Sequence, residues 1–282
     1  ARNFSDRANE FAGKIDELAI YDRALEQEEV EKIYRIKYGA NLVQNGRFDE
    51  LGSELVTQPL NLSSNFQNNG GGVIVDNDTF TTAGGSLDGI SSNSNFLVSG
   101  KTYKLIIAGN TTSSGFTIGN QVLSGNEYAT GFGTHYFVAS GDRLWIRQQT
   151  EGTTNITSFS IKQVDPNDRF ALGTGWAINA SGLVYTGTTN ANAEQEGILT
   201  SGKVYKLTYN VVTSTIDGNV KLMSETVSGT VALQKSVGTH TQLITANGSN
   251  GTDFGIRITG NTTGTYIIDN LMIEQQKYVA SN

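Results

Sequence analysis

The chain has 282 residues, with 33 glycines, two prolines and no cysteine, and its formal net charge is −7 at pH 7. The lack of cysteine excludes disulfides, thiolate nucleophiles and thiolate metal sites. The negative charge argues against nucleic acid and anionic membranes as main partners, because phosphate binding requires clustered lysine and arginine. No apolar run reaches the roughly 18 residues of a membrane-spanning helix, so no membrane insertion is predicted.

The opening segment, residues 1–40, contains the best helical pattern of the chain. Residues 14–21, KIDELAIY, alternate like a strand, and a helix is predicted from Glu26 until Gly39 ends it. Acidic residues in the first turn and basic residues in the last turn agree with the helix dipole. Because the chain begins with Ala1 and shows no signal peptide, we interpret it as a processed or truncated piece of a longer protein.

The stretch from Phe11 to Tyr34, F-A-G-K-I-D-E-L-A-I-Y-D-R-A-L-x-x-E-E-V-x-x-I-Y, resembles the closing segment of concanavalin A-like (laminin G-like) lectin domains. In that family the final strand completes a sandwich, and a short helix follows it. The resemblance implies either that a larger upstream domain has been removed or that the strand finds a new partner here. We therefore expect residues 1–40 to be the end of a lectin-like domain, or an element that docks on the next domain or on a neighbouring chain.

Two copies of one sequence plan follow the opening segment. Matching stretches occur in the same order in both halves, which is the signature of an internal repeat. The matched pairs are NGRF at 45–48 with NDRF at 167–170, LVSGKTYKL at 97–105 with LTSGKVYKL at 199–207, GTH at 133–135 with GTH at 238–240, LWIR at 144–147 with FGIR at 254–257, and FSIKQV at 159–164 with LMIEQQ at 271–276.

Each copy reads as a series of short alternating segments separated by turns rich in Gly, Asn, Ser and Thr. Such a series predicts an antiparallel sandwich in each copy. The stretch DPND at 165–168 marks the joint between them. We therefore predict an all-β fold of two tandem antiparallel jelly-roll β-sandwiches, residues 41–164 and 165–282, preceded by a short strand–helix segment at 1–40.

The openings and closings of the copies, such as NLVQNGRFDE and TYIIDNLMIE, resemble those of carbohydrate-binding-module-like jelly rolls. Repeats this rich in Thr, Asn and Gly look most like those of bacteriophage tail fibres and other virion appendages. The resemblance covers residues 41–276, mostly at turn and core positions. It implies a sandwich fold and a role in attachment or display.

The main candidate site is the stretch RLWIRQQ. Leu144 and Ile146 are predicted to point inward, so Trp145 and Arg147 face outward. The second copy has Gly255 at the matching position, so the fold does not require a ring there. An outward indole beside a guanidinium is a platform for a sugar, an anchor for another domain or chain, or an ordinary half-buried packing residue.

The other aromatic and histidine residues are assigned by their context. Tyr128 and Tyr136, in NEYATGFGTHYF, are predicted to extend the same patch. Trp176 is predicted to fill the core between two sheets. His135 and His240 occupy equivalent positions of the repeat, which favours strand-start residues paired with backbone over catalytic histidines.

Many carbohydrate-binding jelly rolls, which the two copies resemble, hold a structural calcium with one acid after the opening Phe and another in the closing strand. The first copy has Asp49 after its Phe but Thr157 in its closing strand. The second copy has Asp269 in its closing strand but Ala171 after its Phe. Neither copy keeps both acids, so we expect no cofactor; if a structural calcium is bound, Asp269 is the expected ligand.

These features together predict a non-enzymatic virion structural protein, such as a tail fibre, head fibre or decoration protein, on the surface of an extracellular particle. No acidic pair stands in a motif with the spacing of a glycosidase acid and base. Expected partners are other virion proteins, copies of the chain in a cyclic homo-oligomer such as a trimer, and host-surface glycans bound multivalently. Two alternatives are a carbohydrate-binding accessory region of a secreted bacterial glycosidase and a ligand-free capsid cement protein.

Overall fold

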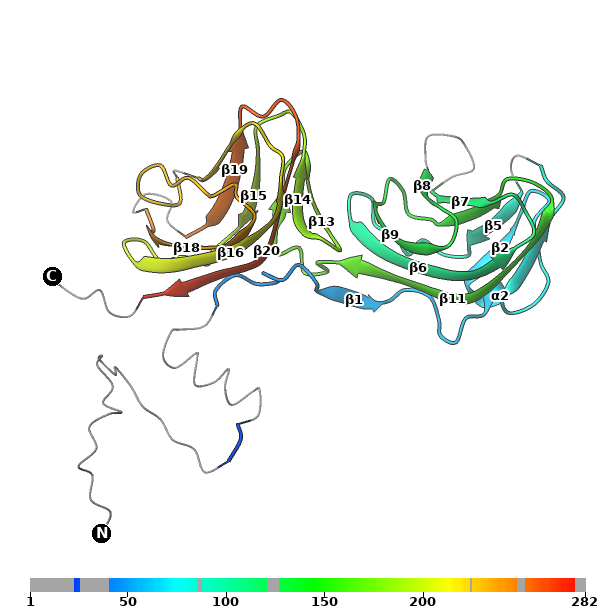
Figure 1. Ribbon diagram of the computed structural model, residues 1–282. Coiled ribbons are helices and arrows are strands. Elements are labelled where there is room, and N and C mark those ends of the chain that lie inside the picture. The colour runs from blue at the N-terminus through cyan, green and yellow to red at the C-terminus, as the bar shows by residue number, and fades with distance from the viewer. Residues whose placement is uncertain are drawn as a thin grey trace, which may run out of the picture.

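The predicted all-β class is confirmed by the computed structural model, in which four antiparallel sheets form two sandwiches (Figure 1). The structure describes residues 23–25, 41–85, 88–120, 127–223, 225–247 and 252–276. The strand and helix predicted within residues 1–40 therefore lie outside the described residues. No helix in the described part of the chain is long and apolar enough to cross a membrane.

The first sandwich consists of β1 to β11 and one short helix. One sheet has the order β3-β4-β11-β6-β9, with β1 also paired to β11, and the other has the order β2-β5-β10-β7-β8. The elements are β1 (Leu51–Glu54), α2 (Leu62–Asn65), β2 (Phe66–Asn69), β3 (Val73–Ile74), β4 (Thr79–Thr82), β5 (Gly89–Ser92), β6 (Thr102–Thr111), β7 (Phe116–Gly119), β8 (Glu127–Thr130), β9 (Gly133–Val138), β10 (Trp145–Gln148) and β11 (Gly152–Val164).

The second sandwich consists of β12 to β20. Its sheets have the orders β13-β14-β20-β16-β18 and β12-β15-β19-β17. The elements are β12 (Ala171–Leu172), β13 (Trp176–Asn179), β14 (Gly182–Thr186), β15 (Ala191–Gln195), β16 (Val204–Ser214), β17 (Asn219–Leu222), β18 (Gly238–Thr245), β19 (Phe254–Thr259) and β20 (Thr265–Gln275).

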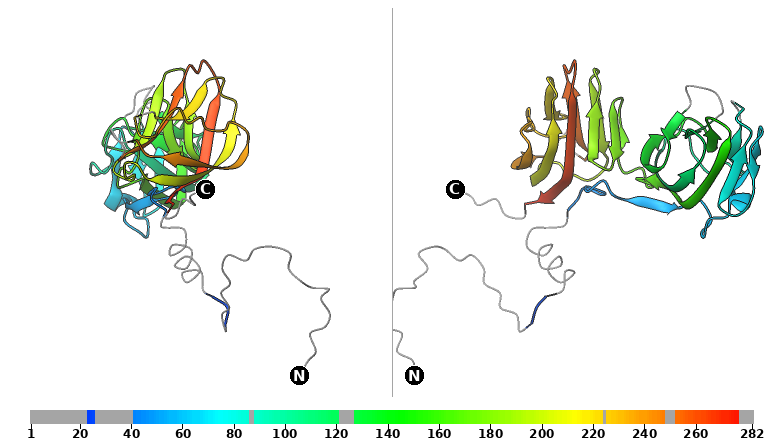
Figure 2. Two further views of the ribbon diagram at one scale, coloured as in Figure 1. Left: turned by 90° about the vertical axis from the view of Figure 1, so that its left-hand side faces the viewer. Right: turned by 45° about the vertical axis from the view of Figure 1, so that its right-hand side comes forward.

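The two sandwiches repeat one topology: the order β3-β4-β11-β6-β9 reappears as β13-β14-β20-β16-β18, and β2-β5-β10-β7 reappears as β12-β15-β19-β17, a sheet without a named strand at the place of β8. Their hydrophobic cores are separate clusters, and the sandwiches stand side by side in the right-hand view of Figure 2. Trp176 is 6% exposed and belongs to the second core, as predicted from the sequence. The internal repeat read from the sequence therefore corresponds to two sandwiches with separate interiors.

The repeated SGKxYKL stretch forms the same turn in both sandwiches. Its glycine has a positive φ in each copy, 85° at Gly100 and 75° at Gly202, a conformation that favours glycine. The buried hydroxyl of Tyr103 accepts a hydrogen bond from the backbone amide five residues earlier at 2.8 Å, and Tyr205 does the same at 2.6 Å. These two contacts explain why this stretch is the most similar part of the two copies.

Residues 41–50 form a strap that packs on the second sandwich before the chain enters β1 of the first. Asn41 bridges to Glu274 on β20, and the amide of Leu271 donates to the carbonyl of Gly46 at 2.8 Å. Val43 and Phe48 belong to the core cluster of the second sandwich. The strap thus lies along β20 much as β1 lies along β11 in the first sandwich.

The joint between the sandwiches combines an aromatic pair with ionic contacts. The rings of Phe48 and Phe170 lie 5.3 Å apart between centroids. The Arg169 guanidinium contacts Glu50 at 2.9 Å and thereby lowers the pKa of that carboxyl. Further polar contacts join Lys101 to Asp168 at 2.6 Å, Asn45 to Asp165 at 3.2 Å and Gln44 to Gln195 at 2.9 Å. The turn after β11 is therefore held to both sandwiches.

Candidate functional site

The outer face of the sheet β2-β5-β10-β7-β8 carries the predicted tryptophan. On β10, Ile146 and Gln148 are buried, whereas Trp145 and Arg147 are half-buried on the opposite face. The inward–outward alternation predicted from RLWIRQQ is therefore observed. β10 is the central strand of this sheet, and Trp145 is its first residue, so the indole lies midway across the strands and at one end of the strand direction.

Small residues stand directly beside Trp145 on both neighbouring strands. Ser91 of β5 is its partner on one side and Gly119 of β7 on the other. Directly opposite residues of antiparallel strands share a face of the sheet. Arg147 is flanked in the same way by Gly89 and Thr117. Ser91 is 0% exposed and Gly119 is also buried, so the indole is the larger and more exposed group at this level of the sheet.

Polar side chains border the indole along the sheet. On the β2 side, the amide nitrogens of Gln67 and Asn69 each lie 3.4 Å from the Ser91 hydroxyl. On the β8 side, Glu127 lies 3.9 Å from the Arg147 guanidinium. This outer face therefore combines one aromatic platform with amide, hydroxyl and guanidinium groups. We call these residues, Gln67, Asn69, Ser91, Thr117, Glu127, Trp145 and Arg147, the Trp145 face.

Asp88 fixes the start of β5 next to this face. Its carboxylate accepts hydrogen bonds from the backbone amides of Gly71 at 2.6 Å and Gly85 at 2.8 Å. These bonds lower the pKa of Asp88, so the group stays ionised. A Cβ at Gly71 would lie 2.6 Å from a carboxylate oxygen of Asp88, so a larger residue would disturb this anchor.

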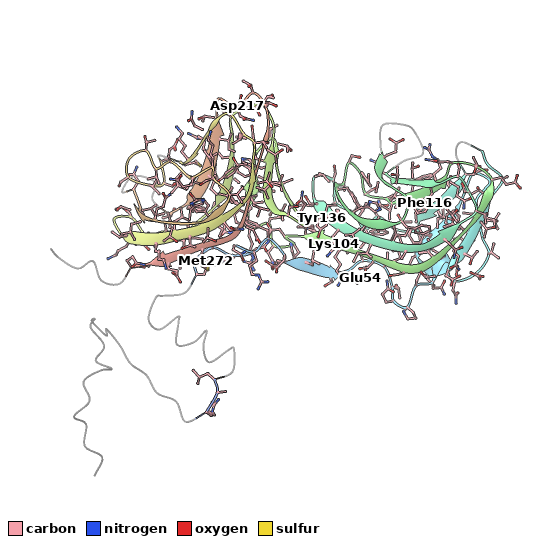
Figure 3. The ribbon with its side chains drawn as sticks, viewed as in Figure 1. Glu54, Lys104, Phe116, Tyr136, Asp217 and Met272 are labelled. Carbon is pink, nitrogen blue, oxygen red and sulfur yellow. The ribbon has the colours of Figure 1, made fainter. Side chains whose placement is uncertain are left out.

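The two tyrosines predicted to extend the patch lie elsewhere. Tyr128 stacks on Phe137 at 4.3 Å between ring centroids, and its hydroxyl accepts from the amide of Ser140 at 2.9 Å. Tyr136 lies on β9, in the other sheet, and packs against the core of the second sandwich. Figure 3 shows Tyr136 near Lys104, whose ammonium lies 5.8 Å from the ring centroid. The structure therefore brings together Trp145 and Arg147, but not the two tyrosines.

Both histidines contact backbone carbonyls, as predicted. His135 Nε2 lies 3.1 Å from the carbonyl oxygen of Gly131, and His240 Nε2 lies 2.7 Å from that of Ser236. In each case the partner is four residues earlier in the chain. The histidine of the repeated GTH stretch thus stabilises the turn before its strand, and neither histidine contributes to the Trp145 face.

Asp269 serves a local backbone contact. Its carboxylate accepts from the amide of Asn270 at 2.7 Å and from the Asn270 side chain at 3.1 Å. Asn270 has a positive φ of 51°, which this pair of hydrogen bonds supports. Among the described residues there is no cluster of three or more His, Cys, Asp or Glu side chains. Asp269 as a calcium ligand remains a prediction from the sequence.

Comparisons with protein-family models and with curated proteins find no match. Among solved structures, the chain is similar to the N-terminal CBM22-1-CBM22-2 tandem domain of Xyn10C from Paenibacillus barcinonensis, with 8% identity, a TM-score of 0.29, and coverage of 80% of this chain and 98% of that chain. It is also similar to allantoicase, with 9% identity, a TM-score of 0.27, and coverage of 89% and 98%. Similarity to truncated AlyQ, with CBM32 and alginate lyase domains, has 10% identity, a TM-score of 0.22, and coverage of 70% and 91%. Scores this low carry no argument about function, which has to be derived from the residues of the chain.

Proposed function

We propose that this protein binds glycans through the Trp145 face, with the indole as the stacking platform. The observation that carries this proposal is a half-buried tryptophan at the start of the central strand of an outer sheet face, flanked by Ser91 and Gly119. A pyranose stacks its C–H face on an aromatic ring while polar groups contact its hydroxyls. The second sandwich has Gly255 at the equivalent position, so folding does not account for the ring.

The polar groups of the face favour a hydroxyl-rich, neutral ligand. Gln67 and Asn69 offer amide donors and acceptors on one side of the indole. Arg147 lies beside Glu127, so its charge is offset within the face. A neutral hexopyranose needs such amide and hydroxyl partners and no net charge to balance its own. We therefore propose neutral hexoses at the surface of a host cell as the ligand class.

Glycan-array screening followed by calorimetry tests the proposal. Trp145→Ala removes the platform, and Arg147→Ala removes a neighbouring polar group. Arg257→Ala is the matched control, because Arg257 is the equivalent arginine on β19 of the second sandwich. We expect binding that Trp145→Ala abolishes, Arg147→Ala weakens and Arg257→Ala leaves unchanged. Binding by no glycan, or binding that Trp145→Ala leaves intact, would contradict the proposal.

The wider role that we propose is non-enzymatic display on a bacteriophage virion appendage, outside the cell. Its support is the repeated, Thr-, Asn- and Gly-rich sandwich plan of the sequence. A weak site of this kind becomes effective when several copies of the chain are assembled, because effective concentration multiplies single contacts. Mass spectrometry of purified particles should find the chain. A gene that instead joins it to a signal peptide and a catalytic domain would favour the accessory region of a secreted glycosidase.

A further inference from the structure

The strand β18 is an edge strand that lacks the usual protection against pairing. It pairs with β16 on one side over its whole length, Gly238 to Thr245, and the pairing contains no bulge. Its sequence, GTHTQLIT, contains no proline, lysine, arginine, aspartate or glutamate. Leu243 is 66% exposed, and Val237, just before the strand, is 69% exposed. Natural proteins usually blunt such an edge with charges, prolines or bulges, or cover it with another segment.

Among the described residues, backbone cover for this edge is confined to one end of the strand. The amide of Ser228 donates to the carbonyl of Thr245 at 2.8 Å, and Val227 bridges to Ala246. Within the described part of the chain, no backbone group outside the sheet hydrogen-bonds to the backbone of residues 238–244. The outer edge of residues 238–244 therefore presents a row of backbone donors and acceptors to a partner.

The equivalent edge of the first sandwich contacts another sandwich. In that sheet Tyr136 of β9 stands opposite Lys104 of β6, and in the second sandwich Leu243 of β18 stands opposite Lys206 of β16. Tyr136 packs against the core of the second sandwich, so this position lies at the joint. By strand register Leu243 matches Tyr136, because the GTH stretches of β9 and β18 differ by two residues in their pairing with β6 and β16. Leu243 lies at the opposite end of the molecule, where Figure 1 shows β18 on the side away from the first sandwich.

We propose that β18 is a self-association surface at which β18 of a second copy of this chain pairs in antiparallel orientation. Pairing about a two-fold axis joins two sheets into one continuous sheet, and this symmetry is the most common among homodimers. A strand without charged residues meets no like charge when it faces its own copy. Thr239, Thr241 and Leu243 supply exposed side chains for cross-strand pairs.

The charges nearest to this surface do not oppose the pairing. Lys206, next to Leu243 in the sheet, lies 3.9 Å from the buried carboxylate of Glu274. Lys235 donates to the carbonyl of Gly218 at 3.0 Å. The charge of Lys206 is thus offset by Glu274, whereas Lys235 keeps its charge and is held at the Gly218 carbonyl.

Pairing through β18 would present two Trp145 faces at once, which strengthens multivalent display. The biological role of the dimer therefore rests on the proposed display function. The two surfaces lie on different sandwiches. A variant of one therefore leaves the other intact, and the two hypotheses can fail independently.

Sedimentation velocity over a range of protein concentrations tests the surface. We expect the natural chain to show a monomer–dimer equilibrium, and T241K/L243K to raise the dimer dissociation constant at least about 100-fold by opposing like charges across the two-fold axis. V73K is the matched control, because Val73 is 49% exposed on β3, an edge strand of the first sandwich. Circular dichroism verifies that each variant is folded. A natural chain that stays monomeric, or a double variant that dimerises like the natural chain, overturns the proposal.

The absence of cysteine allows a second test by disulfide cross-linking. Single cysteines at Thr239, Thr241 and Leu243 are oxidised one at a time, and the fraction of covalent dimer is measured. An antiparallel two-fold pair predicts a maximum at the position closest to the axis and lower values on either side. Equal yields at all three positions overturn the proposal. So does a monomer whose β18 amides resist hydrogen exchange, because a segment of the same chain would then cover the edge.

Discussion

The two sandwiches share a strand order but differ on the outer face of one sheet. The first has Trp145 on the central strand of this face, and the second has Gly255 at the same strand position. A Cβ at Gly255 would lie 2.3 Å from the Met223 sulfur, so the Met223 side chain occupies the space above that glycine. One face presents a ring, whereas the other is filled by its own chain.

The arginines that follow these positions show the same divergence. Arg257 in the second sandwich is held by Asn192 at 2.8 Å and by Glu225 at 3.2 Å. Arg147 in the first sandwich has a longer ion pair, 3.9 Å, with Glu127. A shared fold therefore explains the strand pattern, and the difference between the faces is the comparison that the glycan proposal uses.

The largest expected effect is loss of glycan binding on removal of the ring. Trp145→Ala should weaken binding by at least about tenfold, since truncation of a central aromatic residue costs on the order of 2 kcal/mol or more. Its effect on unfolding should be smaller, because the side chain lies on an outer face. Calorimetric titration with the best glycan of an array gives the affinity, and thermal unfolding gives the stability. Equal losses of affinity and of folding would mean that Trp145 acts through structure.

The strap provides a second comparison, because residues 41–50 complete the second sandwich where β1 completes the first. A Cβ at Gly46 would lie 2.1 Å from the carbonyl oxygen of Leu271, so Gly46→Val should push the strap away from β20. We expect a loss of about 1–3 kcal/mol in the free energy of unfolding of the second sandwich. Hydrogen exchange should rise in β20 and stay unchanged in β6. Equal exchange in both sandwiches would show that the strap does not belong to the second.

The repeated hydrogen bond to the tyrosine hydroxyl should contribute the same free energy to the stability of both sandwiches. Tyr103→Phe and Tyr205→Phe each remove a hydroxyl that accepts a hydrogen bond from a backbone amide, at 2.8 Å and 2.6 Å respectively. We expect each change to cost about 1 kcal/mol, the typical net value of one hydrogen bond. Chemical denaturation followed separately for the two sandwiches measures both. A loss in the free energy of unfolding that differs several-fold between the two variants would mean that the hydrogen bond does not stabilise the two sandwiches equally.

Much of the fold was predictable because it depends on local patterns. Alternation in RLWIRQQ placed Trp145 on the outer face, and the recurring SGKxYKL turns indicated two copies of one plan. The all-β class follows from the same short-range signals. Each of these predictions uses residues that are close together in the sequence, and each is observed in the structure.

The rest of the candidate site depends on contacts between distant residues. Gln67 and Asn69 reach Ser91 from 24 and 22 residues away, through a strand register that the sequence does not display. The stretch NEYATGFGTHYF crosses from β8 of one sheet to β9 of the other, which separates Tyr136 from Trp145. The strap contacts β20 across 230 residues of chain, at Asn41 and Leu271. The sequence repeat assigned residues 41–50 to the first sandwich, which follows them in the chain. In the structure these residues pack on the second sandwich.

A smaller effect should distinguish the sandwiches at low pH. The loops that meet at the end of the first sandwich are joined by neutral hydroxyls, with Ser113 Oγ 3.1 Å from Thr150 Oγ1. The matching loops of the second sandwich, at the end where Figure 3 labels Asp217, use a carboxylate. The Asp217 carboxylate accepts from the Thr262 hydroxyl and from its amide at 2.9 Å, which lowers the pKa of Asp217 from 3.8 to about 2.

A carboxyl whose pKa is lower in the folded state than in the unfolded state stabilises the fold when ionised. The stabilisation by Asp217 should therefore be complete above about pH 4 and lost as the pH falls towards 2. Asp217→Asn keeps the shape of the group but removes its titration, so the variant should be slightly less stable at neutral pH and should lose less stability on acidification. Thermal unfolding from pH 6 to about pH 2 measures both slopes. If the variant and the natural chain lose stability in parallel, the hydrogen-bonded carboxylate does not contribute to the acid sensitivity of the second sandwich, and the two loop pairs are energetically equivalent despite their different chemistry.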